Sequence, residues 1–228
     1  MSSSLDLQRS GWYPVLASKF LPFETVEQTS LHAQDLALWR SADGAVHAWE
    51  NRCPHRSVRL SIGVVREDQL VCRYHGWSFD GDGRCTCIPA NPELAPPSAA
   101  CVRTFAAIER HGLVWASLAP DDPEPPVLDA ELVYARSFGL SLDASKIFTM
   151  ARDSGMVVLG GCMAPGSDDE QTLGACALLL QPETPMHCTV HLLCLPERRQ
   201  QAVAWFKSVR SQWLVTAREP SAKEMTHA

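Results

Sequence analysis

Short apolar runs separated by turn residues dominate the first half of the chain. Runs of this kind, bounded by glycine and aspartate, are typical of β-strands. They are Leu36–Arg40, Val46–Glu50, Leu70–Arg73, Trp77–Phe79, Val102–Ile108 and Leu113–Leu118. Asp43-Gly44 separates the first two, and Asp-Gly is a strong signal for a tight hairpin. The pattern predicts an antiparallel, all-β domain at 1–120.

A proline-rich stretch interrupts this pattern. Residues 120–126 are Pro-Asp-Asp-Pro-Glu-Pro-Pro, and four prolines in seven positions exclude a continuous helix or an interior strand. We therefore place a linker at 121–126, between the first domain and a second unit at 127–228.

The second unit begins with further apolar runs and ends in a helical pattern. Strands are predicted at Lys146–Arg152, Met156–Ala164, Leu173–Gln181 and Met186–Leu195. From Glu197 to Arg218 the period changes, because Val203, Phe206, Val209 and Trp213 recur at helical spacing. The whole chain is therefore predicted to be mainly β, with a second unit of four antiparallel strands under one helix, a helix-over-sheet (helix-grip-like) α+β arrangement.

Composition narrows the class of protein. Charged residues make up 20% and hydrophobic residues 46%, as in a soluble globular protein. The net charge of -6 argues against a nucleic-acid-binding face. No stretch approaches the ~20 apolar residues that span a bilayer, and the start of the chain lacks a signal-peptide pattern. Nine cysteines, an odd number, then predict reduced thiols and metal ligands in the cytoplasm.

Two short motifs carry candidate metal ligands. One is Cys53-Pro54-His55-Arg56, and the other is Cys72-Arg73-Tyr74-His75-Gly76-Trp77. Each motif supplies one thiolate and one imidazole, so the two together present four ligands. A zinc ion could use all four. A [2Fe–2S] cluster, with two thiolates on one iron and two imidazoles on the other, uses them equally well. The proline and the glycine suit tight loops over a cluster, and both motifs lie at predicted turns.

These motifs resemble the Rieske domain of the bacterial Rieske non-haem iron oxygenases, in the branch that includes vanillate O-demethylase. The similarity continues in Leu60–Gly63, Cys85–Pro89 and Gly112–Trp115, and it covers roughly residues 11–120. The resemblance implies a Rieske [2Fe–2S] cluster whose histidine-bound iron accepts and passes the electron.

The ligand assignment also follows from this resemblance. It gives Cys53 and Cys72 to one iron, and His55 and His75 to the other. High-potential respiratory Rieske proteins are similar, but they add a disulfide between the two loops and hydroxyl groups bonded to the cluster sulfurs. Trp77 and nearby Phe79 offer no such hydroxyl, which implies a potential at the lower end of the range.

The second unit lacks the iron site that complete oxygenases of this family carry. That site holds a mononuclear Fe(II) on a facial triad of two histidines, about five residues apart, and one carboxylate. Residues 127–149 contain no histidine, and Val215–Pro220, which is comparable to the family's ligand-bearing closing helix, contains no aspartate. Residues 181–191 still resemble the family's last strands, so we expect a shortened catalytic domain that has lost its iron-binding part.

Glu183, His187 and His191 are the remaining candidates for a mononuclear iron. On a helix the two histidines would share one face. Met186–Leu195 is predicted to be a strand, however, where residues four apart are separated by about 13 Å. Mononuclear Fe(II) is therefore not expected here.

Three functions remain open on this sequence. The first is an electron-transfer component of a ring-hydroxylating or demethylating oxygenase system, reduced by a reductase or ferredoxin and passing electrons to a mononuclear iron on another subunit. In that case His55, Arg56, Tyr74, His75 and Trp77 form the docking face. The second is a self-contained mono-oxygenase or demethylase with a non-standard iron site. The third is a non-catalytic structural or regulatory relative. Open sheet edges in a shortened unit also predict a homo-oligomer or a mixed assembly with a full-length oxygenase subunit.

Overall fold

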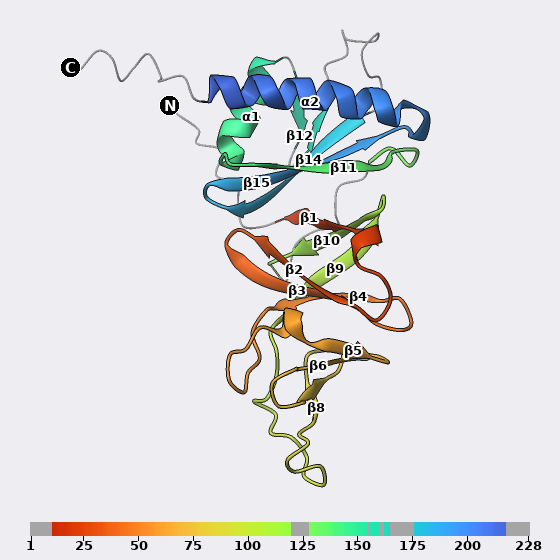
Figure 1. Cartoon of the computed structure of the whole chain (residues 1–228), viewed down its shortest axis with the longest axis vertical. Helices are drawn as coiled ribbons and strands as arrows, with labels where there is room; N and C mark the ends of the chain where they lie inside the picture. The colour runs from red at the N-terminus through yellow and green to blue at the C-terminus, as the bar shows by residue number, and fades with distance from the viewer. Residues whose placement is uncertain (1–10, 120–127, 155, 160–161, 165–175, 218–228) are drawn as a thin grey trace, which may run out of the picture.

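The elements are stacked in layers along the long axis of the molecule (Figure 1). The structure, a computed structural model, describes residues 11–119, 128–154, 156–159, 162–164 and 176–217. Two α-helices cover a five-stranded sheet, a six-stranded sheet follows, and a small four-stranded sheet lies at the end away from the helices. No helix in the described ranges has the length and apolar character that crossing a membrane requires.

The six-stranded sheet forms the body of the first unit, in the order β1-β10-β9-β4-β3-β2. Its strands are β1 (Trp12–Ala17), β2 (Val26–Leu31), β3 (Gln34–Arg40), β4 (Val46–Glu50), β9 (Thr104–Arg110) and β10 (Leu113–Ser117). The hairpin predicted around Asp43-Gly44 is confirmed as β3 and β4. Side chains of β3 alternate between two cores, since Leu36 and Leu38 pack on one face of the sheet and Trp39 on the other.

Both cluster motifs lie in loops of the four-stranded sheet, one in the loop that leads into it and one between two of its strands. Its strands, in spatial order, are β5 (Val64–Arg66), β6 (Gln69–Val71), β7 (Ser78–Phe79) and β8 (Cys85–Cys87). The first motif lies between β4 and the short helix η2 (Leu60–Ile62), and the second connects β6 to β7. A further short helix, η1 (Ser18–Phe20), follows β1. Both motifs thus belong to the end of the molecule opposite the α-helices.

The second unit contains more elements than the sequence predicts. Its described strands are β11 (Val133–Leu140), β12 (Val157–Leu159), β13 (Cys162–Ala164), β14 (Cys176–Thr184) and β15 (His187–Cys194), in the spatial order β11-β15-β14-β13-β12. A short helix, η3 (Pro196–Arg198), precedes α2 (Arg199–Thr216). The closing helix and the last two strands are confirmed, β11 was missed, and the run from Met156 to Ala164 is two strands. The predicted linker lies outside the described residues, so the domain boundary stays a prediction.

The predicted strand at Lys146–Arg152 is wrong, because this segment belongs to helix α1 (Ala144–Asp153). Asp143 caps the helix, since its carboxylate accepts a hydrogen bond from the backbone N–H of Lys146. Ala144, Ile147 and Ala151 are all buried and lie at helical spacing. The short apolar run resembled a strand, and the capping aspartate was the signal that distinguishes the two.

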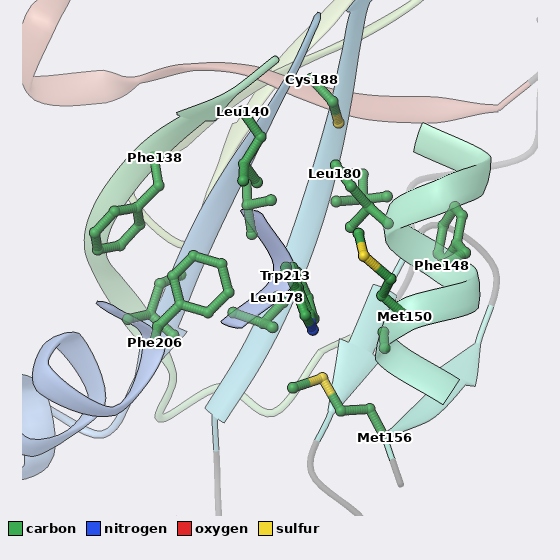
Figure 2. Close-up of a cluster of buried hydrophobic side chains, with 14 of the residues drawn as sticks. Phe138, Leu140, Phe148, Met150, Met156, Leu178, Leu180, Cys188, Phe206 and Trp213 are labelled. Carbon is green, nitrogen blue, oxygen red and sulfur yellow. The ribbon is translucent and has the colours of Figure 1, made fainter. Parts of the chain in front are cut away.

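A large apolar core fills the space between the five-stranded sheet and its helices (Figure 2). The side chains labelled there come from β11, β14 and β15 on the sheet side and from α1, Met156 and α2 on the other, and they are Phe138, Leu140, Phe148, Met150, Met156, Leu178, Leu180, Cys188, Phe206 and Trp213. The predicted packing of the closing helix across the sheet is thereby confirmed.

Hydrogen bonds join the two units where the β2–β3 turn meets strand β14. The backbone N–H groups of His32 and Ala33 donate to the carbonyls of Pro182 (2.6 Å) and Glu183 (2.8 Å). The side-chain amide of Gln181 donates to Oγ1 of Thr29 at 2.8 Å. An apolar cluster that includes residues of β10, β11, β14 and β15 lies at the same junction. The second unit is therefore packed directly on the first.

His191 is the buried polar centre of this junction. It is 2% exposed; its Nε2 lies 2.9 Å from Oε1 of Gln181, and its Nδ1 lies 2.8 Å from the hydroxyl of Ser137. The amide oxygen of Gln181 can only accept, so Nε2 carries the proton and Nδ1 accepts from Ser137. Burial lowers the pKa of His191 to about 3, so this imidazole is neutral in the folded protein.

We predict that this histidine makes the protein less stable as the pH falls. In the unfolded chain His191 takes up a proton near its ordinary pKa of about 6.5, whereas in the folded chain it does so only near pH 3. Between these two pH values the unfolded state binds more protons than the folded state. The free energy of unfolding that is present above pH 6.5 therefore decreases as the pH falls. Between pH 7.5 and 5.0 the loss from this group is about 2 kcal/mol. Urea unfolding of the wild type and of His191→Gln at both pH values measures it. Equal pH dependence in the two proteins would contradict the prediction.

Candidate cluster site

The two cluster loops close on their cysteines in the same way. In the first loop the N–H of Cys53 donates to the carbonyl of Val58, and the carbonyl of Cys53 accepts from Ser57, both at 2.8 Å. In the second loop the N–H of Cys72 donates to Trp77, and the carbonyl of Cys72 accepts from Gly76, both at 2.9 Å. Each cysteine is thus bonded to the residues four and five positions further along the chain.

The fourth position after each cysteine has a left-handed backbone. Gly76 has φ +71°, and a Cβ there would lie 3.1 Å from Cγ of Pro89, so both conformation and space favour glycine. Its counterpart Ser57 has φ +58° without being glycine. The motif spacing hides this correspondence, because the histidine is two residues after Cys53 but three residues after Cys72.

The four predicted ligands form an inner and an outer pair. Cys53 and Cys72 are 1% and 3% exposed, whereas His75 is exposed and His55 is half-buried. The Nδ1 atoms of the two histidines lie 3.1 Å apart, so both imidazoles turn the same nitrogen towards one position. Burial raises the pKa of the Cys53 thiol to about 11, with the Cys72 thiol adding to this effect. A bound cation would favour the thiolate form of Cys53.

This donor set fits a two-iron cluster better than a zinc ion. Zinc would require all four side chains to converge on one point. In the part of the chain that the structure describes, no three or more His, Cys, Asp or Glu side chains are arranged to hold a single metal ion. A [2Fe–2S] cluster instead needs two thiolates on one iron and two imidazoles on the other. The buried pair and the exposed pair match that requirement.

An aromatic ring lies against each imidazole. The indole of Trp77 stacks on His55 with ring centroids 4.4 Å apart and planes within 5° of parallel. Tyr74 lies against His75, with ring centroids 3.9 Å apart. These contacts restrict rotation of the imidazole rings and so keep their Nδ1 atoms directed towards each other. Sequence reasoning had placed both aromatic residues on the docking face but had not found this role.

Asn51 holds the end of the first loop in place through hydrogen bonds to Ser61 and Asp35. Its buried side chain donates to the hydroxyl of Ser61 at 2.9 Å and to Oδ1 of Asp35 at 3.1 Å, and its Oδ1 accepts from the N–H of Ser61. The residue thereby connects β3, the end of β4 and helix η2. Sequence reasoning missed it, although an asparagine two positions before Cys53 was the available signal.

The structure does not bring the three mononuclear-iron candidates together as free ligands. His187 and His191 lie in strand β15, as the strand prediction expects. Both ring nitrogens of His191 are hydrogen-bonded to protein side chains, and Glu183 accepts a hydrogen bond from Thr189. His187 is exposed, with its Nε2 3.4 Å from the hydroxyl of Ser141.

A family model and several curated proteins match this chain. The family model described as "Rieske [2Fe-2S] domain" matches residues 11–106. "Oxidoreductase NdmD" of Pseudomonas putida is 43% identical over 136 residues, which are 58% of this chain and 23% of that protein. "4beta-methylsterol monooxygenase" of Methylococcus capsulatus is 43% identical over 116 residues, or 49% of this chain and 30% of that protein. The matches thus span less than a third of these curated relatives.

Solved structures share the fold over both units. "Pseudomonas putida CBB5 NdmA" has a TM-score of 0.68 at 21% identity, covering 82% of this chain and 73% of that chain. Apo dicamba monooxygenase has a TM-score of 0.69 at 20% identity, covering 96% and 89%. At these identities the likeness concerns the fold alone, and the narrower resemblance to vanillate O-demethylase stays a prediction. Residues 11–106 therefore match the Rieske [2Fe-2S] domain, and the chain has the fold of these solved structures.

Proposed function

We propose that this chain is an electron-transfer component of a ring-hydroxylating or demethylating oxygenase system. It receives electrons from a reductase or ferredoxin and delivers them to a mononuclear iron on another polypeptide. The observation that carries the proposal is the pair of Nδ1 atoms 3.1 Å apart, on two loops whose cysteines are buried. The names of two relatives, an oxidoreductase and a monooxygenase, agree with this chemistry.

Each ligand has a separate task in this proposal. Cys53 and Cys72, which lie in the apolar core that also contains Trp39 and Trp49, would hold one iron. His55 and His75, whose Nδ1 atoms lie 3.1 Å apart, would hold the other iron. When bound, the cluster supplies a site that gains and loses one electron. The chain excludes water from the sulfur side and exposes the imidazole side to a partner.

A self-contained mono-oxygenase is the second candidate, and the geometry favours it less. It would need Glu183, His187 and His191, or ligands outside the described residues, to hold iron. Both nitrogens of His191 already have protein partners in a 2% exposed position. A non-catalytic relative that keeps the cluster for folding or redox sensing is the third candidate.

We predict two irons and two acid-labile sulfides per chain in anaerobically purified protein. Cys53→Ser and Cys72→Ser should each lose the cluster and its visible absorbance, because each variant removes a thiolate from the inner iron. Cys101→Ser is the matched control, since Cys101 is exposed and lies outside both loops. Iron and sulfide analysis distinguishes the candidates, and a third iron that disappears in His187→Ala would favour the mono-oxygenase.

The reduction potential should lie near the lower end of the Rieske range, at roughly -150 mV. Trp77 and Phe79 provide no hydroxyl to donate to the cluster sulfurs, and the eight cysteines that the structure describes are all free, so no disulfide tightens the loops. Fewer hydrogen bonds to the sulfurs lower the potential. Spectroelectrochemical titration measures it, and a value well above zero would contradict this reasoning.

We also propose that the chain assembles with copies of itself or with a full-length oxygenase subunit. Strand β11 is an edge of the five-stranded sheet, and edges of this kind pair readily with another chain. Light scattering at micromolar concentration should give a mass above the 25.1 kDa of one chain. A monomer would contradict self-assembly.

A further inference from the structure

The two cluster loops are held at their ends in different ways. The second loop joins two paired strands, since Val71 of β6 lies opposite Ser78 of β7. Backbone hydrogen bonds between these strands fix where that loop begins and ends. The first loop leaves β4 after Glu50 and enters helix η2. Strand β4 pairs with β3 and β9, so within the described residues no strand pairing joins the two ends of the first loop.

Side-chain hydrogen bonds of Asn51 join the ends of the first loop instead. Its Nδ2 donates to Oγ of Ser61 at 2.9 Å, and its Oδ1 accepts from the N–H of Ser61 at 2.8 Å. Asn51 lies two residues before Cys53, and Ser61 belongs to η2, so the two bonds connect one side of the loop to the other. A pair of bonds between the same two residues fixes their relative orientation as well as their distance.

Asp35 of β3 determines which way this amide points. Oδ1 of Asp35 accepts from Nδ2 of Asn51 at 3.1 Å, and the backbone carbonyl of Asp35 accepts from the N–H of Asn51 at 3.0 Å. A carboxylate oxygen accepts and does not donate, so the amino group of Asn51 faces Asp35 and its carbonyl oxygen is left for Ser61. Asn51 is 4% exposed, so water does not readily replace a partner that is lost.

The other contacts of the first loop fix its position less closely. Leu60 is fully buried and anchors η2 in the apolar core, but apolar contact has no preferred direction. Arg52 donates to the hydroxyl of Ser57 at 2.9 Å, and both residues are exposed, so water competes for this bond. The ion pair of Arg59 with Asp35, at 3.6 Å, is also exposed and therefore weak.

We propose that Asn51 is a positioning residue for the cluster, which sets where Cys53 and His55 lie relative to Cys72 and His75. The inference rests on the proposed function, because it concerns the same cluster. A Rieske cluster needs ligands from both loops at once, so a first loop that shifts against the second weakens the hold on both irons. Groups that orient metal ligands typically contribute about 10- to 100-fold to metal affinity.

Iron release from the dithionite-reduced, cluster-loaded full chain to bathophenanthroline disulfonate tests the inference. Asn51→Ala should release iron at least about tenfold faster than the wild type. Ser61→Ala removes one of the two bonds to Asn51 and should have a smaller effect of the same sign. In the Asn51→Ala background the change at Ser61 should add nothing, because both residues act through the same bonds. Additive effects would overturn the inference.

The electron paramagnetic resonance spectrum of the reduced cluster separates positioning from general stability. Asn51→Ala and Ser61→Ala should broaden its lines, because a loosened loop holds the ligands in a range of geometries. Gln28→Ala is the matched control, since the amide of Gln28 donates to the same Oδ1 of Asp35 at 2.9 Å without reaching the loop. Val15→Ala removes buried methyl groups from the apolar cluster that lacks both cysteines, and so destabilises the fold alone. Both controls should keep the wild-type spectrum.

The outcomes distinguish this inference from the proposed function. A wild-type spectrum and release rate in Asn51→Ala, or equal broadening in Gln28→Ala or Val15→Ala, would overturn the positioning role alone. If Asn51→Ala does not fold, as measured by circular dichroism, the milder Ser61→Ala decides the question by the same two measurements. A wild-type chain without two irons and two sulfides would instead overturn the proposed function.

Discussion

The structure depends on one constraint, which is that two separate loops must present a thiolate and an imidazole each to the same small volume. Both loops meet it by the same backbone closure, in which the cysteine is bonded to the residues four and five positions later. This closure fixes the cysteines inside and turns the histidines outwards. The strands on either side hold the ends of the loops, so the architecture of the first unit follows from that requirement.

Burial and exposure then divide the site into two halves with different properties. The sulfur side lies in a core with Trp39, Trp49 and Phe79, where a low local dielectric favours a cluster of small net charge. The imidazole side faces solvent, with Trp77 and Tyr74 holding the rings and Arg56 and Arg73 beside them. The two loops thus bring the predicted ligands, the aromatic rings that restrict them and two arginines together.

The sequence was sufficient to predict features that depend on residues close together along the chain. The β3–β4 hairpin follows from Asp43-Gly44, whereas the ligand pairs follow from a family resemblance of the two motifs and stay a prediction. Helix α1 was misassigned because a seven-residue segment with four apolar side chains suits the period of a strand or of a helix until the cap at Asp143 is considered. Asn51 and Ser57 could not be ranked as site residues, because their roles arise from partners that only the folded backbone brings near.

The β2–β3 turn shows how the two units are connected energetically. His32 and Ala33 have φ values of +48° and +64°, a conformation that suits a tight hairpin but costs non-glycine residues about 1–2 kcal/mol each. Their N–H groups donate to carbonyls of strand β14. The strained turn of one unit is therefore stabilised by the backbone of the other, which couples their unfolding. Loss of the junction would release both at once, and the chain would melt as one cooperative body.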